Sequence, residues 1–289
     1  MEEFEYQEQL NLCVGRLKEE LSDVSLDRLN DVTLAFVEDH SDWTVDYNKE
    51  EDTIYIEKEK FKNSPKQSQE LMTGLLNAIT TDKTTKKSGI SFDGKMEAFN
   101  RGVTHQLANA LIPEEEENLT DFECGVVANL FTSIVGRDTV YDAYFKKDGE
   151  RVYSKLAKKL GGDYEYLDTM LSLSDLNMTT LNDKSHPSLL GYIQEGVSKK
   201  YIENNDLSLE QVKEFRDGLF TEAEYAPSDG VTRLLSCATC DCYVAKKQQE
   251  MEKQTSRVGR MDERRKNDLD AMFESEMGKR STKRVTVRR

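Results

Sequence analysis

The sequence contains no uninterrupted run of about 18 apolar residues, the length that a membrane-spanning helix requires. Residues 1–5 are acidic and lack the basic segment and apolar core of a secretory signal. Only five cysteines are present and three of them are crowded together, which is not the spacing of a secreted disulfide framework. We therefore expect a cytoplasmic protein in a reducing compartment, with no membrane association.

Several catalytic motifs are also missing. The sequence has no phosphate-binding loop of the type Gly-x-x-x-x-Gly-Lys-Ser/Thr and no Gly-x-Ser-x-Gly nucleophile turn. No internal repeat is visible. Carboxylates are abundant, but no pair is distinguished from the others, and the acid run at residues 114–117 is most simply a solvated loop.

The charge of the chain is large and unevenly distributed. Its 289 residues are 33% charged and carry a net charge of -15, which disfavours nonspecific binding to nucleic acids and anionic membranes. Residues 279–289 nevertheless contain six basic side chains and no acidic one, so residues 1–278 carry -21. The C-terminal end is therefore electrostatically distinct from the rest.

Hydrophobic periodicity predicts a mainly helical α+β protein with a small β-hairpin near the N-terminus. Apolar residues alternate with polar ones over 43–47 and 54–56, on either side of a polar turn. Helical spacing is expected to give two N-terminal helices, the second at about residues 26–36, and Ser64 and Pro65 to begin a third. Further helices are expected at about 95–111, 122–134, 140–145, 152–160, 187–203 and 208–224.

These expectations divide the chain into four parts. They are N-terminal helices over 1–40, a core over 41–160, a helical subdomain over 161–230 and a flexible helical and basic segment over 231–289. At this length the chain can form one large domain or two small ones.

The order of elements in the core has a parallel among metallopeptidases. Residues 64–81 follow the hairpin and precede a second helix, whose segment Phe99–Leu107 reads FNRGVTHQL. That segment resembles the motif Asn-Glu-Gly-x-Thr-Glu of zincin-like proteins of the gluzincin type, and residues 126–145 are similar to the helix pair that trails it in uncharacterised bacterial members. The resemblance covers residues 43–160 and implies a zincin-like fold, with a small sheet packed on helices.

The same resemblance implies that the zinc ligands are lost. The positions of the two His ligands and of the catalytic Glu correspond to Asn77, Thr81 and Ala78, and the third ligand, a Glu, corresponds to Arg101, 20 residues after Thr81. Asparagine and threonine are poor zinc ligands and arginine repels a cation. The resemblance thus implies a pseudoenzyme with no catalytic residues and no cofactor. An ordinary amphipathic helix in a coincidental order of elements is the alternative interpretation.

A cluster of three cysteines, Cys237, Cys240 and Cys242, is the second feature with chemical potential. Thiolates at Cys-x-x-Cys spacing can bind zinc or an iron–sulfur cluster, but the fourth ligand of a structural site would have to come from a distant helix. We favour cysteines packed in a core or a partner interface, with metal binding and a redox pair as alternatives.

The basic C-terminal residues are a solvated tail with no specific partner or, alternatively, a site for nucleic acid or a protein, and they are Lys279, Arg280, Lys283, Arg284, Arg288 and Arg289. No aromatic residue is interleaved, so base stacking is not available to them. Residues 246–277 are expected to form a polar helix with a thin, Met-rich apolar row. We favour an ordinary solvent-exposed helix, with a surface for a partner helix or self-association as the alternative. The leading hypothesis is a non-catalytic interaction or structural protein. A nucleic-acid-associated protein and a metal-dependent hydrolase with unrecognised ligands are the alternatives.

Overall fold

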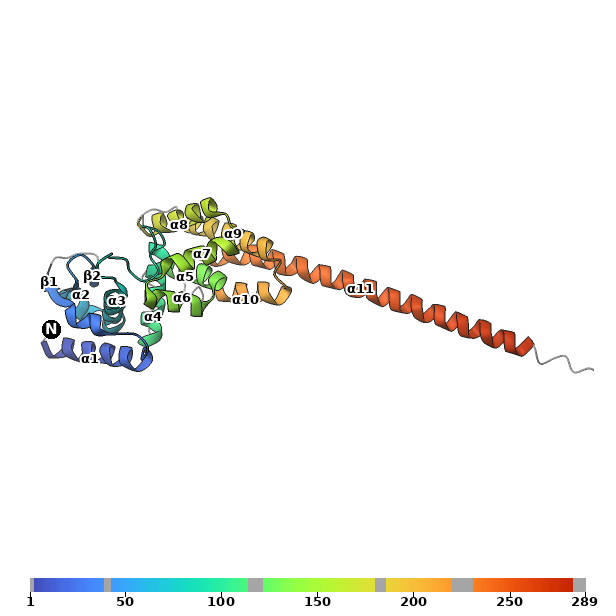
Figure 1. Ribbon diagram of the computed structural model, residues 1–289, viewed down its shortest axis with the longest axis horizontal. Helices are drawn as coiled ribbons and strands as arrows, with labels where there is room; N and C mark the ends of the chain where they lie inside the picture. The colour runs from blue at the N-terminus through green and yellow to red at the C-terminus, as the bar shows by residue number, and fades with distance from the viewer. Residues whose placement is uncertain (1–2, 39–42, 114–121, 180–185, 220–230, 283–289) are drawn as a thin grey trace, which may run out of the picture. The chain divides into compact units, whose positions relative to one another are not determined.

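The computed structural model describes residues 3–38, 43–113, 122–179, 186–219 and 231–282 (Figure 1). These residues are mostly helical and include one small three-stranded sheet. Contacts between Cα atoms divide the chain into two units, Met1–Cys240 and Asp241–Arg289. Among the described helices, none is both long and apolar enough to cross a bilayer.

The sheet has the strand order β1-β3-β2, built from β1 (Thr33–Val37), β2 (Val45–Asn48) and β3 (Thr53–Glu57). Strands β2 and β3 are antiparallel, as the alternating pattern predicts, and β1 adds to the other edge of β3 in parallel. The helix expected at residues 26–36 is wrong: a short 3₁₀ helix, η1 (Asp27–Asp31), is followed by β1. Leu34 and Phe36 pair with Ile54 and Ile56, so the spacing of two between these apolar residues is that of a β-strand.

Three helices accompany the sheet, α1 (Glu3–Glu20), α2 (Lys58–Asn63) and α3 (Gln67–Thr80). Helix α3 approaches the sheet closely at Gly74, where an added Cβ would lie 3.0 Å from Val45 and 3.2 Å from Ile54. It begins at Gln67 and not at Ser64 and Pro65, because Ser64 ends the short helix α2 instead. The absence of a side chain at Gly74 therefore sets the distance between α3 and the hairpin.

An ion pair holds the hairpin turn, η1 and the end of α3 together. The two terminal nitrogens of Arg28 donate to the two carboxylate oxygens of Asp52 at 2.5 Å each, and the Tyr47 hydroxyl donates to the same carboxylate at 2.7 Å. Arg28 Nε also donates to the Thr81 carbonyl, at 3.5 Å. Burial acts to raise the pKa of Asp52, but the hydrogen bonds from Arg28 and Tyr47 outweigh it and hold that pKa below its usual value.

Helix α4 (Glu97–Leu111) joins the sheet region to the helical body, because it packs on α3 and also on α5 (Phe122–Val135) (Figure 1). At Gly102 an added Cβ would lie 2.1 Å from the Cys124 carbonyl oxygen of α5. Phe99 and Phe131 meet across the same interface, with ring centroids 5.4 Å apart. The core of this part of the protein is therefore centred on the α4–α5 pair.

The other helices of the body pack around α5, and they are α6 (Arg137–Lys146), α7 (Gly149–Lys159), α8 (Tyr164–Thr179), α9 (His186–Asn205) and α10 (Leu209–Leu219). Helix α8 is an addition to the helices expected individually. Its buried residues Leu167, Met170, Leu171 and Ser174 stand at positions i, i+3, i+4 and i+7, the spacing of an amphipathic helix. The expected helix at 208–224 is described only as far as Leu219.

Helix α11 (Val231–Thr282) passes from the first unit into the second and is the only element of the second unit among the described residues. From residue 245 onward its described side chains are almost all exposed. The expected long polar helix is therefore present.

Candidate functional site

The α3–α4 pair contains the four positions that the zincin-like resemblance singles out. Ala78 and Thr81 are completely buried, whereas Asn77 is partly exposed and Arg101 is exposed. From Leu71 to Thr80, the partly exposed residues of α3 are Thr73 and Asn77, which lie four residues apart on one helix face. The accessible polar pair in this part of the helix is thus Thr73 and Asn77.

On α4 the accessible side follows the same spacing. Glu97 and His105 are partly exposed and Arg101 between them is exposed, each four residues from the next. The residue before His105, Thr104, makes the contact between the two helices: its Oγ1 lies 3.5 Å from Asn77 Oδ1. The structure therefore brings Asn77 to Thr104 and leaves Ala78 and Thr81 on the core side of α3.

A buried polar network lies behind this contact. The Thr104 hydroxyl donates to the Asn100 carbonyl at 2.9 Å and lies 2.8 Å from the Tyr144 hydroxyl of α6. The Asn100 side chain in turn accepts from the Ile90 backbone amide at 2.9 Å. Burial raises the pKa of Tyr144 to about 12, so this phenol stays neutral and serves as a hydrogen-bonding group.

The turn before α4 reaches into the same network at Gly89. Its φ is +52°, and an added Cβ would lie 2.2 Å from Asn100 Oδ1 and 2.7 Å from the Tyr144 ring. Asn100 therefore fixes the 81–96 loop against α4 and α6. The network explains why amides and hydroxyls occupy this region, since each satisfies a buried backbone or side-chain group.

The donor set around Asn77 does not fit a catalytic zinc ion. Such an ion requires imidazole, thiolate or carboxylate ligands and an open coordination position. The positions that would supply them hold an amide at Asn77, a methyl group at Ala78, a hydroxyl at Thr81 and a guanidinium at Arg101. Across the side chains that the structure describes, no group of three His, Cys, Asp or Glu residues could hold a metal ion.

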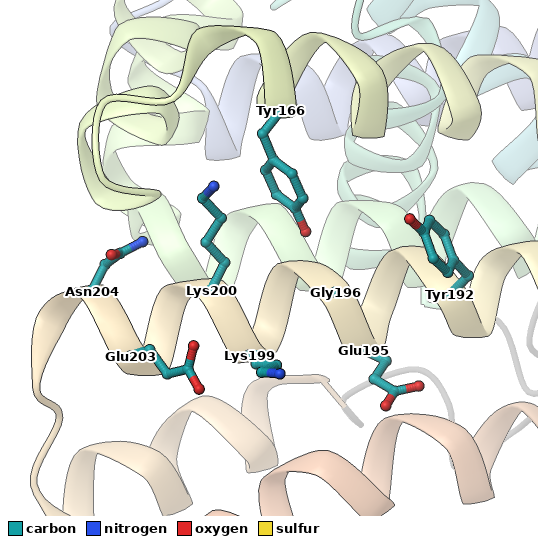
Figure 2. Close-up of a pocket in the computed structure, with 8 residues that line it drawn as sticks. All are labelled: Tyr166, Tyr192, Glu195, Gly196, Lys199, Lys200, Glu203 and Asn204. Carbon is teal, nitrogen blue, oxygen red and sulfur yellow. The ribbon is translucent and has the colours of Figure 1, made fainter.

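A second polar region is a hollow of about 560 Å³ at α8 and α9 (Figure 2). Tyr166 of α8 and Lys200 of α9 point toward each other, with the ammonium 4.2 Å from the ring centroid. Lys200 also forms an ion pair with Asp163 at 2.5 Å, which lowers the pKa of that carboxyl. Burial, followed by the nearby Tyr192, raises the pKa of Tyr166 to about 12.

The charges that line this hollow balance one another. It contains two lysines and two glutamates, Lys199, Lys200, Glu195 and Glu203. Lys200 is already engaged by Tyr166 and Asp163. The arrangement therefore ties α8 to α9 and favours no particular ligand charge.

The cysteine cluster lies on α11, where the described thiols have different surroundings. Cys240 is completely buried and Cys242 is exposed, and the side chain of Cys237 lies outside the described part. Neither described thiol is in a disulfide. Of the basic residues, Lys279 and Arg280 belong to α11 with undescribed side chains, and Lys283, Arg284, Arg288 and Arg289 lie outside the described residues.

Three comparisons with known proteins give no match: no family model, no curated protein and no solved structure is similar to this chain.

Sequence reasoning did not single out Thr73 of α3, Thr104 of α4 or Tyr144 of α6, although Thr104 occupies the Thr position of the motif Asn-Glu-Gly-x-Thr-Glu. Thr73 could have been found by its spacing of four from Asn77, which places both on one helix face. Thr104 lies within the FNRGVTHQL segment, three residues after Arg101, but its partner on α3 is a tertiary contact. Tyr144 is 40 residues from Thr104, so no local pattern predicts their contact.

Proposed function

We propose that this chain is a non-catalytic, zincin-like pseudoenzyme that acts through protein contacts in the cytoplasm. The observation that carries the proposal is the Asn77–Thr104 contact, which joins the two helices where a metallopeptidase would hold its ion. A short sheet with an antiparallel hairpin precedes these helices, as the zincin-like arrangement requires. An amide, a hydroxyl and a neighbouring guanidinium can bind a polypeptide but cannot activate a zinc-bound water.

The second unit supplies a surface for such contacts. Along α11 a row of apolar side chains is more than half exposed, formed by Met251, Val258, Met261, Leu269 and Met272. Methionine-rich surfaces adapt to the shape of a partner because the side chain is unbranched and flexible. The row is therefore suited to a partner helix.

The metal content of the purified full-length chain tests the non-catalytic proposal. We expect less than about 0.1 zinc per chain outside the cysteine cluster, because Asn77, Thr81 and Arg101 supply none of the imidazole, thiolate or carboxylate groups that hold zinc in proteins. The matched control is the variant C237S/C240S/C242S, which separates zinc held by the cysteines from zinc held elsewhere. One zinc per chain that persists in this variant, together with peptidase activity that a chelator removes, would overturn the proposal.

A nucleic-acid function is the second candidate, and the segregated charge favours it. Residues 279–289 carry six positive charges, which could neutralise several phosphates. We would then expect the full chain to bind DNA or RNA with an affinity that falls steeply between about 50 and 200 mM salt. A chain that ends at Gly278 should lose this binding, and equal binding by both chains would remove this candidate.

A further inference from the structure

Four residues of the apolar row of α11, Met251, Val258, Met261 and Met272, stand at the core positions of a coiled-coil heptad, and polar residues fill the other core positions. Met251, Val258, Arg265 and Met272 are seven residues apart, and Gln254, Met261 and Asp268 each follow three residues later. The apolar members of this row are 51–68% exposed, so neighbouring residues of the second unit do not cover it. We propose that a second copy of this chain covers it, with the two α11 helices packed antiparallel. This inference rests on the proposed function, in which the chain acts through protein contacts.

A lone helix of this length needs such a partner. Helices in water gain most of their stability from packing an apolar face. Between residues 245 and 272, α11 has no buried face among its described side chains. The row is narrow, with one or two apolar positions in each seven residues, and this shape fits another helix better than a globular surface. The covering element is therefore a helix.

The charge of α11 is compatible with pairing to itself. Residues 241–272 contain eight Lys and Arg against seven Asp and Glu, so two such helices are nearly neutral and do not repel. A strongly basic or strongly acidic helix would instead require a partner of opposite charge. A two-fold pair also buries the same row on both chains.

Arg265 and Asp268, the charged residues at the core positions of the heptad, favour the antiparallel orientation. In a parallel pair, Arg265 would face Arg265 of the other copy and Asp268 would face Asp268, which places like charges at the centre of the seam. An antiparallel register with Val258 opposite Met261 puts Arg265 beside Gln254 and Asp268 beside Met251 instead, so like charges no longer meet. It also brings Leu269 level with Glu250 and beside Met251, so this apolar residue meets the partner's row.

The net charges of the two units favour the same orientation. Residues 241–289 carry 14 Lys and Arg against nine Asp and Glu, a net charge of +5, which leaves -20 on residues 1–240. In the antiparallel register, Lys279 of one copy is level with Cys240 of the other, the last residue of the acidic unit. A parallel pair would place two acidic units at the same end of the seam.

The contact area makes this a concentration-dependent dimer. In this register Asp241 is level with Gly278, so the seam of 38 residues is about 57 Å long and about 10 Å wide, and two copies bury on the order of 1,000 Å² in total. This area is at the low end of the range for specific complexes. We therefore expect monomers of 33.1 kDa and dimers of twice that mass to coexist at micromolar concentrations.

Sedimentation of the full-length protein at increasing concentration tests the pairing. Met261→Glu should weaken dimerisation at least about ten-fold, because the two copies of this residue lie in the central layers opposite Val258. Ser256→Glu adds the same charge at an exposed position on another face of the helix, so its dissociation constant should stay within about two-fold of the wild type. A monomer at all concentrations, or equal effects of the two substitutions, would overturn the pairing.

A spin label on the exposed Cys242, in a Cys237→Ser chain, tests the orientation. In the antiparallel register the two labels are about 35 residues apart along the seam, or about 50 Å, whereas a parallel pair brings them within about 20 Å. A Cys242→Ser chain should give no such distance, and a short distance in the labelled dimer would overturn the antiparallel assignment. The zinc content and peptidase assay decide the non-catalytic proposal independently, so a monomeric but metal-free chain would remove only the pairing.

Discussion

At the scale of single residues, Gly89 is the position that tolerates least change in the α3–α4 region. A side chain there would have to adopt a φ of +52° and would also enter the space of Asn100 Oδ1 and of the buried Tyr144 ring. The positive φ alone costs about 1 kcal/mol for a residue other than glycine, and overpacking a buried site adds about 1–3 kcal/mol. We expect Gly89→Ala to lower the free energy of unfolding by about 2–4 kcal/mol.

The matched control is Gly94→Ala in the same loop. Gly94 also has a positive φ, +70°, but nothing lies within 4 Å of an added Cβ. Its cost should therefore be about 1 kcal/mol, from the backbone alone. Urea denaturation followed by circular dichroism measures both variants, and equal losses at the two positions would show that the network around Asn100 and Tyr144 does not constrain the loop.

At the scale of elements, the Arg28–Asp52 pair holds η1, the β2–β3 turn and the end of α3 together. Asp52→Asn preserves the left-handed turn conformation, φ +58°, because asparagine adopts it readily, but it removes the charge that Arg28 and Tyr47 recognise. We expect a loss of about 1 kcal/mol at neutral pH, since the pair is only partly buried and water screens it. Glu38→Gln, which breaks the exposed Lys58–Glu38 pair, should cost less than about 0.5 kcal/mol.

The direction of the Asp52 pKa shift gives this comparison a pH dependence. The pKa of Asp52 is lower in the folded than in the unfolded chain. The contribution of its carboxylate to the free energy of unfolding is therefore complete above the unfolded pKa of about 3.9, and it disappears as pH falls through the folded pKa. The stability difference between wild type and Asp52→Asn should therefore shrink below about pH 4. A difference that is constant from pH 7 to pH 3, measured by denaturant unfolding, would contradict a role for the carboxylate charge.

The same elements show how far the sequence could predict the fold. The hairpin and the long helices were predictable because their periods of two and 3.6 are local properties of the chain. Strand β1 was not, because Leu26, Leu29 and Val32 have helical spacing while Leu34 and Phe36 gain their partners from β3, some 20 residues away. Tertiary pairing thus decided the conformation of a segment whose local pattern favoured a helix.

The α3–α4 region shows the corresponding limit for the candidate site. Which residues stand at the expected metal positions follows from the sequence alone, and so does their unsuitability as ligands. Which of them is accessible depends on the rotation of α3 against the sheet and α4, and this rotation leaves Asn77 accessible and buries Thr81. Packing of Gly74 on Val45 and Ile54 fixes that rotation, so only the three-dimensional arrangement could reveal Thr104 as the neighbour of Asn77.

At the scale of the whole molecule, removal of residues 279–289 separates the two roles that their charge allows. If these residues meet the acidic unit of a second copy, a chain that ends at Gly278 should dimerise several-fold more weakly at about 50 mM salt, and by less at about 500 mM. Dimerisation itself should persist, because the apolar row from Met251 to Met272 remains intact. Sedimentation of both chains at the two salt concentrations measures this difference.

The outcome depends on which partner the positive charges meet. An interaction between charges weakens as salt rises, whereas burial of the apolar row does not. At high salt the full-length chain should therefore dimerise no more tightly than the shortened chain, but neither dimer should dissociate completely. If truncation abolishes binding to DNA or RNA and leaves dimerisation unchanged at both salt concentrations, the tail serves nucleic acid and the antiparallel pair must be held by its apolar seam alone. If truncation weakens only dimerisation, the six basic residues of 279–289 interact with the -20 charge of the first unit of a second copy, and the chain's uneven charge distribution is a device for self-assembly.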